Sequence, residues 1–340
     1  MALSLGAPQR APQSPSRRPA GPTRWSKHRL GVLAIVVSAT AMGTAGLFGR
    51  MATPPGADLG DALTLGRMLV GALGMLALLA AGRRLGLLRR SRPSASVVLG
   101  GVFLGLSLAT YLSATVLIDL ALAVVLHYIG PVLATVLARV VRKERITGLD
   151  AVGLLVSVVG MALAAGLVGG SPAPTSDQQT WGTVLGVASG VFYGAALLTY
   201  RYRSDMPADI RSFWNFAFGA LAVGAMVAVS RPDLSGMTGQ NWAWAIAFFL
   251  ICGLLALGLL VVAGQYLRPA ELSGLSYLEV VVALLLGVAV YGESLSALAG
   301  IGAALVVIAA LLPLAAGRNG RSDDRAYEPE PGLEPAAAPD

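Results

Sequence analysis

Apolar runs long enough to cross a lipid bilayer recur along this chain, and they constrain its fold more than any other feature. About 20 helical residues cross a bilayer core of about 30 Å. Charged residues make up only 13% of the chain, against about 25% in soluble domains. The sequence therefore predicts an all-α integral membrane protein with ten transmembrane helices. The predicted spans are 30–49, 62–81, 95–113, 119–141, 148–168, 180–200, 210–230, 242–264, 270–291 and 295–316.

The distribution of Lys and Arg tests this prediction independently. With the N-terminus in the cytoplasm, 22 of these residues fall in segments on the cytoplasmic side. Arg50 and Arg231 fall on the other side, and Arg67 lies within a span. Cytoplasmic loops of membrane proteins carry an excess of Lys and Arg. We therefore expect a multi-pass protein of a bacterial-type plasma membrane with both termini in the cytoplasm.

Composition also argues against several classes of function. The net charge of +7 does not indicate a nucleic-acid partner, because the basic residues sit in short loops between apolar runs. Cys252 is the single cysteine, which excludes an intramolecular disulfide and a cysteine-rich metal site. Two histidines are too few for a metal centre, so we expect no metal and no cofactor. An ATP-binding loop of the GxxxxGK[ST] kind does not occur, so active transport would draw on an ion or solute gradient.

The second half of the chain repeats the first. Residues 126–147 align with residues 275–296 at a constant offset of 149, with polar matches inside otherwise apolar sequence. A second alignment sets residues 31–50 over residues 182–201 at an offset of 151. The polar matches are Tyr128 with Tyr277, Glu144 with Glu293, Ser38 with Ser189 and Arg50 with Arg201.

Five spans in each half give the two halves opposite orientations in the membrane. Inverted repeats are typical of many secondary transporters, whose substrate site lies near the midplane between the repeats. The predicted organisation is a disordered cytoplasmic tail at 1–28, five-helix repeats at 29–168 and 180–316, and a second disordered cytoplasmic tail at 317–340.

The ends of the repeats carry a family resemblance. The relevant segments are 128–131 (YIGP) with 143–145 (KER), and 277–279 (YLE) with 292–294 (GES). This pattern resembles EamA-type members of the drug/metabolite transporter superfamily, which commonly show LEP followed by GE. The GP pair at 130–131 is similar to the threonine/homoserine exporter branch, and residues 63–67 (LTLGR) resemble that family's second span. The resemblance implies ten spans and transport of a small solute.

Two departures weaken what the resemblance implies about cargo. Val280 stands where the family usually has Pro after the Glu. Arg142 and Lys143 replace the usual Leu-Gly before Glu144. The fold expectation is unaffected by these changes.

Glu279 is the strongest candidate for a substrate-binding residue. It lies near the middle of the ninth span, where a charged group costs roughly 2.5–3.5 kcal/mol on insertion scales. We expect it to face a cavity or to be protonated; the alternative is a hydrogen bond between helices. The neighbouring Tyr277 and its repeat partner Tyr128 complete this part of the predicted site.

His127 is the second candidate, in the middle of the fourth span. Pro131 has no N–H to offer the carbonyl of residue 127, so a backbone acceptor is freed at membrane depth. The alternative is a packing histidine beside a kinked helix. The remaining candidates are Arg67, which binds substrate or extends to the interface, and Trp214 with Asn215, which bind substrate or belong to the membrane interface.

These observations favour a secondary transporter, acting as an exporter of amino acids or related metabolites by alternating access. The alternative within this class is a proton-coupled exporter of drugs or cationic compounds. A membrane-embedded enzyme and a non-transporting scaffold fit the sequence less well. The expected partners are a small-molecule substrate and the lipid bilayer, with protons as one coupling option, and the protein is a monomer or a homodimer.

Overall fold

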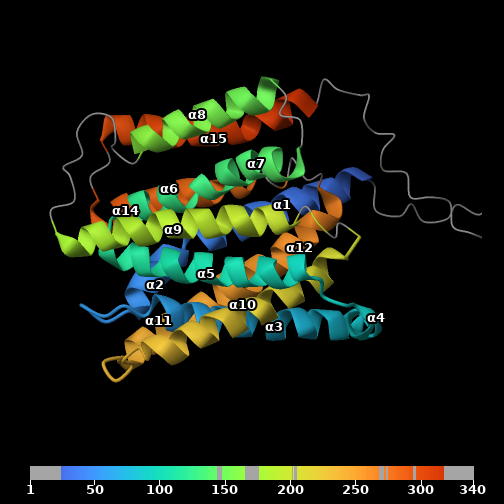
Figure 1. Cartoon of the computed structure of the whole chain (residues 1–340), viewed down its shortest axis with the longest axis horizontal. Coiled ribbons are helices and arrows are strands. Elements are labelled where there is room, and N and C mark those ends of the chain that lie inside the picture. Colours follow the sequence, from blue (N-terminus) through green and yellow to red (C-terminus); the bar gives the residue numbers. More distant parts are fainter. Residues whose placement is uncertain are drawn as a thin grey trace, which may run out of the picture.

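A bundle of long helices makes up the computed structural model (Figure 1). It describes residues 24–143, 148–164, 176–200, 202, 205–267, 272, 275–293 and 296–317. Every regular element in these ranges is helical. The elements are α1 (Arg24–Gly43), α2 (Ala45–Ala52), α3 (Gly60–Ala81), α4 (Leu85–Arg90), α5 (Ala95–Leu117), α6 (Leu120–His127), α7 (Ile129–Arg142), α8 (Gly148–Ala164), α9 (Asp177–Tyr200), α10 (Ala208–Ser230), α11 (Gly239–Phe248), the π-helical η1 (Phe249–Leu255), α12 (Ala256–Tyr266), α14 (Leu278–Tyr291) and α15 (Ala297–Gly317).

The helices confirm the predicted fold class. Seven helical segments within the described residues are long and apolar enough to cross a membrane, and three shorter apolar helices accompany them. The protein is therefore an all-α, multi-pass membrane protein with about ten spans. The predicted tails, 1–28 and 317–340, fall almost entirely outside the described residues.

The two ends of the bundle differ in charge. The end that holds α4 carries Arg83, Arg84, Arg89, Arg90 and Arg92, and we call it the basic end. The opposite end, which we call the far end, holds the last turn of α2 with Arg50 and the start of α3. At the far end Gly60 of α3 packs directly on Ser113 of α5, so three spans end at one level.

The repeat that the sequence predicts is visible in the secondary structure. Helices α7 and α14 each contain 14 residues, and both of their boundaries are related by the offset of 149. Each helix ends at a residue with positive φ, Lys143 at 57° and Gly292 at 63°. The repeat partners of Glu293 and Arg50, which are Glu144 and Arg201, lie outside the described residues.

Several spans are interrupted at similar depth. The first predicted span, 30–49, is not one helix but breaks at Thr44 between α1 and α2. The fourth breaks at Tyr128 between α6 and α7, and α14 begins immediately after a turn at Tyr277. The eighth contains the π-helical turn η1. Breaks at membrane depth leave backbone groups that the surrounding protein or a cavity has to satisfy.

Glycines on α9 bring this helix against the break at Tyr128. A Cβ atom on Gly186 would lie 2.8 Å from the Leu126 side chain, and one on Gly194 would lie 2.9 Å from the Gly130 carbonyl oxygen. A Cβ atom on Gly190 would clash with the Leu126 carbonyl oxygen. Small residues permit such close approach of helices in membranes, so α9 of the second half is packed tightly on α6 and α7 of the first.

Replacing Gly190 with Ala should therefore destabilise the protein. The new methyl group meets a backbone oxygen that cannot rotate away, and overpacking of this kind costs about 1–3 kcal/mol. The matched control is Gly300→Ala in α15, because a Cβ atom there meets nothing within 4 Å. Thermal unfolding in detergent should show a lower midpoint for Gly190→Ala alone. Equal midpoints for the two variants would contradict the close packing of α9.

Candidate functional site

An aromatic cluster surrounds His127 in the middle of the bundle. The imidazole ring stacks on the Tyr193 ring of α9 with centroids 4.6 Å apart, and it lies 4.9 Å from the Tyr111 ring of α5. Its Nδ1 is 3.0 Å from the hydroxyl of Ser189, also on α9. His127 and Ser189 are both buried. The cluster therefore joins both halves of the chain around one polar side chain.

The two repeat-related tyrosines meet beside this cluster. The rings of Tyr128 and Tyr277 have centroids 5.4 Å apart, and each tyrosine stands at the helix break of its own half. The Tyr128 hydroxyl lies within hydrogen-bonding reach of the Glu279 carboxyl. Glu279 is partly accessible rather than buried. The carboxyl group thus lies where the two inverted halves face each other.

Arg67, on α3, is a second charged residue near Glu279. It is only 3% exposed, so the alternative in which it extends to the membrane interface is wrong. Its Nη2 lies 2.9 Å from the Met42 sulfur, and its guanidinium is 5.4 Å from the Phe248 ring centroid. Its Nε has no hydrogen-bond partner among the described residues. A buried guanidinium with a free N–H can receive an anionic group.

We define the central cluster as Arg67, Tyr111, His127, Tyr128, Tyr193, Tyr277 and Glu279. A helical rise of 1.5 Å per residue puts Glu279 about 18 Å from Tyr291 at the far end of α14. Arg67 lies about 10 Å from the start of α3 by the same measure. Both depths fall well inside a bilayer core of about 30 Å. Arg67 and Glu279 are close enough to interact electrostatically.

The chemistry of the central cluster suits a small polar solute with charged groups. Arg67 offers a positive pole and Glu279 offers a negative one, while the aromatic rings offer faces that attract cations. The tyrosine hydroxyls and the histidine can both donate and accept hydrogen bonds. Such convergent polar groups in an otherwise apolar lining are typical of ligand sites.

The remaining predicted site residues lie elsewhere. Trp214 is near the basic end, where its Nε1 donates to the Ser91 hydroxyl at 2.9 Å and its ring stacks on Phe218. Asn215 is buried against the Gly100 and Gly101 backbone of α5, and its Oδ1 has no partner among the described residues. The structure does not bring either residue to the central cluster.

Pro131 is the predicted site residue that follows the break at Tyr128. It lies in the first turn of α7, directly after the break at Tyr128, and its carbonyl accepts from the Thr135 hydroxyl at 3.0 Å. This position is compatible with proline, because the first turn of a helix does not need its N–H. The break therefore lies at Tyr128, three residues before the proline that predicts it.

Sequence reasoning missed Tyr111, Tyr193, Met42 and Phe248. A signal for the two tyrosines was present, because each is a polar group inside an apolar span, as Glu279 is. Ser189 also had a signal, since the repeat pairs it with Ser38. Met42 and Phe248 have none, because an apolar side chain near a buried arginine looks like any other core residue in sequence.

Inverted halves, interrupted spans and charged groups at mid-membrane together define a membrane transporter. The chain belongs to the EamA-like transporter family, whose model matches it twice, at residues 29–166 and 180–314. This agrees with the resemblance that the sequence motifs carry.

Two further similarities support the assignment. The chain is 27% identical over 286 residues to an uncharacterized transporter of Archaeoglobus fulgidus, covering 84% of this chain and 96% of that protein. A protein of known crystal structure is similar with a TM-score of 0.61 and 22% identity, covering 88% of this chain and all of the other. At this identity the likeness to the crystal structure shows the fold alone.

Cys252 offers a direct test of the packing around Arg67. Its side chain is fully buried on η1, and its Sγ donates to the Ala41 carbonyl at 3.1 Å. We expect a membrane-permeant maleimide to leave the folded protein unlabelled and to label it fully in denaturing detergent. Mass spectrometry of the intact protein reads out the modification. Rapid labelling of the folded protein would contradict the closed packing between η1 and the break in the first span.

Proposed function

We propose that this protein is a secondary transporter that carries small organic solutes across the plasma membrane by alternating access. Amino acids or related metabolites are the favoured cargo, and export is the favoured direction. The basic end faces the cytoplasm in this proposal, because Lys and Arg concentrate in cytoplasmic loops. The far end then opens to the outside.

The observation that carries the proposal is the position of the central cluster. Inverted-repeat transporters bind substrate near the midplane, at interrupted helices where the repeats meet. Here the turns at Tyr128 and Tyr277, one from each half, lie beside Glu279. Charged groups in spans are rare and mark substrate or ion pathways.

The two poles of the cluster support amino acids as cargo. A zwitterion carries a carboxylate and an ammonium group close together. Arg67 matches the first by charge, and Glu279 with the tyrosine rings matches the second. The family model and the relative from Archaeoglobus fulgidus support transport and leave the cargo open.

A proton-coupled exporter of cationic compounds is the second candidate. It is favoured by Glu279 and the four tyrosine rings of the central cluster, which would bind a cation without help from Arg67. The two candidates differ in what they demand of the solute. A zwitterion site requires the carboxylate, so it should reject the decarboxylated amine, whereas a cation site should accept that amine.

Transport into liposomes tests the proposal. Purified protein is reconstituted, and labelled amino acids and their decarboxylated amines are offered with and without a pH gradient. Accumulation of at least one amino acid above protein-free liposomes is expected. Amines alone would favour the second candidate, and no accumulation of any compound in either condition would contradict both.

Glu279→Gln should abolish gradient-driven accumulation while the protein remains folded and inserted. Gln keeps the shape and the hydrogen bond near Tyr128 but removes the negative charge and its titration. Asp233→Asn is the matched control, because it removes an exposed carboxylate from the loop after α10. Size-exclusion profiles check folding. Normal accumulation with unchanged pH dependence in Glu279→Gln would reduce this residue to a structural hydrogen bond.

A further inference from the structure

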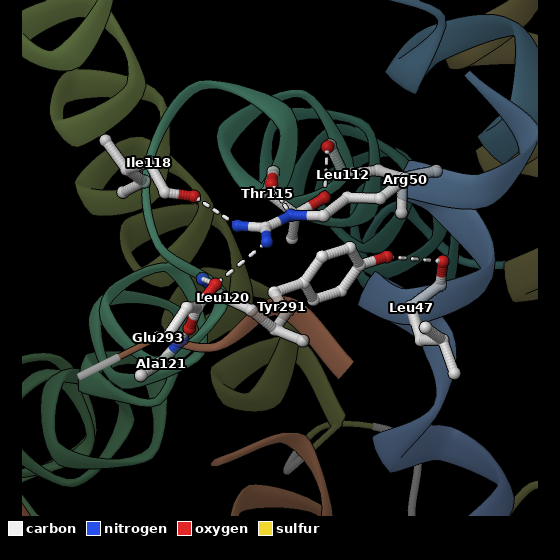
Figure 2. Close-up of polar contacts among 9 residues, drawn as sticks. All are labelled: Leu47, Arg50, Leu112, Thr115, Ile118, Leu120, Ala121, Tyr291 and Glu293. Carbon is white, nitrogen blue, oxygen red and sulfur yellow. Dashed lines mark hydrogen bonds and ion pairs between the residues drawn. The ribbon is translucent and has the colours of Figure 1, made fainter. Parts of the chain in front are cut away.

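An ion pair at the far end joins the two halves outside the central cluster. Arg50, at the end of α2, places Nη1 2.8 Å from Oε1 of Glu293, just beyond the end of α14 (Figure 2). Glu293 is only 7% exposed and Arg50 is 17% exposed. This pair is therefore shielded from water far more than an ordinary surface salt bridge.

Arg50 also holds the last turn of α5. Its Nη2 donates to the Ile118 carbonyl at 2.6 Å, and its Nε donates to the Thr115 carbonyl. The last carbonyls of a helix lack intrahelical partners and carry partial negative charge, so a guanidinium is a suitable partner. One cation thus satisfies a carboxylate and a helix C-terminus together.

Glu293 holds the first turn of α6 in the complementary way. Its Oε1 accepts from the Leu120 N–H at 2.7 Å and its Oε2 from the Ala121 N–H at 3.2 Å. The N-terminus of a helix favours negative charge. Gly292, with φ of 63°, lets the chain turn back after α14 so that the carboxylate reaches α6.

Tyr291 closes the arrangement from the side of α14. The Arg50 guanidinium lies 4.5 Å from its ring centroid, and its hydroxyl lies 3.3 Å from the Leu47 carbonyl of α2 (Figure 2). The ends of α2, α5, α6 and α14 are therefore tied together through one pair of side chains.

We propose that Arg50 and Glu293 form a latch that closes the far end of the bundle above the central cluster, and that the latch opens whenever solute crosses to that side. The inference rests on the proposed function, because only a transporter needs this end to open. Opening separates α14 from α2 and α6, which are three of the four elements whose ends the latch joins. The latch consists of bonds that the two side chains make to each other and to backbone groups at helix ends. These bonds can break while the hydrogen bonds within each helix stay intact, so opening does not unfold a helix.

Ala283 provides a position from which to observe the latch. It is 1% exposed, and it lies on α14 between Glu279 and the latch, packed with residues of α5 and α6. The test uses Cys252→Ser as background, since serine can keep the hydrogen bond to Ala41, and adds Ala283→Cys as reporter. A membrane-impermeant thiol reagent is applied from the far-end side of oriented vesicles.

With the latch intact, the reporter should react slowly. Glu293→Gln should accelerate its modification roughly tenfold or more, because each 1.4 kcal/mol of lost stabilisation shifts the equilibrium tenfold. Arg50→Gln should do the same. The double variant should react more slowly than the product of the two single accelerations predicts, because both changes remove the same Arg50–Glu293 pair.

Three controls separate the latch from general loosening. Asp233→Asn removes another far-end carboxylate and should leave the reporter slow. Glu144→Gln removes the repeat-related acid of the other half and should also leave it slow. Ser235→Cys, on an exposed loop, should react rapidly in every variant and shows that the reagent reaches this side.

The outcomes divide clearly. A slow reporter in both Glu293→Gln and Arg50→Gln, in protein that elutes normally on size exclusion, would overturn the latch. Equal acceleration by Asp233→Asn would overturn it too. If Glu293→Gln does not fold, Glu293→Asp and Arg50→Lys replace it, with smaller accelerations expected in the same direction. If the reporter reacts faster in the variants but the protein transports no solute, the latch stands and the proposed function is contradicted. If the protein transports solute but the reporter stays slow in the variants, the proposed function stands and the latch is contradicted.

Discussion

The rest of this structure depends on the cost of leaving backbone and charged groups unpaired inside a membrane. Each break in a span frees groups that lipid cannot satisfy, so breaks have to meet protein or an enclosed polar space. Here the breaks at Thr44, Tyr128 and Tyr277 gather around Arg67 and Glu279, which need the same environment. The central cluster brings these groups together, and it is where we propose that a solute binds.

Close helix packing makes this convergence possible. The glycines of α9 let its backbone approach the carbonyl groups at the end of α6, so the second half closes over the break of the first. The Ser107 hydroxyl on α5 donates to the Ser189 carbonyl on α9 at 2.8 Å, which ties a third helix to the same region. The far-end pair of Arg50 and Glu293 stabilises helix ends instead. The positive charge of Arg50 pairs with the C-terminus of α5, and the negative charge of Glu293 pairs with the N-terminus of α6.

Much of the fold follows from the sequence, because each span has to be apolar and about 20 residues long. The offset of 149 even predicts the matching bounds of α7 and α14. The break at Thr44 was not predicted, since neither Gly43 nor Thr44 excludes a continuous helix. Within the site, Glu279, His127 and Tyr128 come together because polar groups in spans share one interior. Trp214 does not join this site, because an aromatic side chain near the end of a span can equally well pack against its local neighbours.

The central claim is that the repeat-related breaks of the two halves meet at mid-membrane and form the solute pathway. Short-span cross-linking of Tyr128→Cys with Tyr277→Cys, in the Cys252→Ser background, tests it most directly. A protease site inserted between residues 165 and 175 then reports whether the halves remain joined after cleavage. We predict that the cross-linked halves migrate together on a denaturing gel and that cross-linked protein no longer transports. Halves that separate after treatment, from protein that is folded before it, would contradict the account.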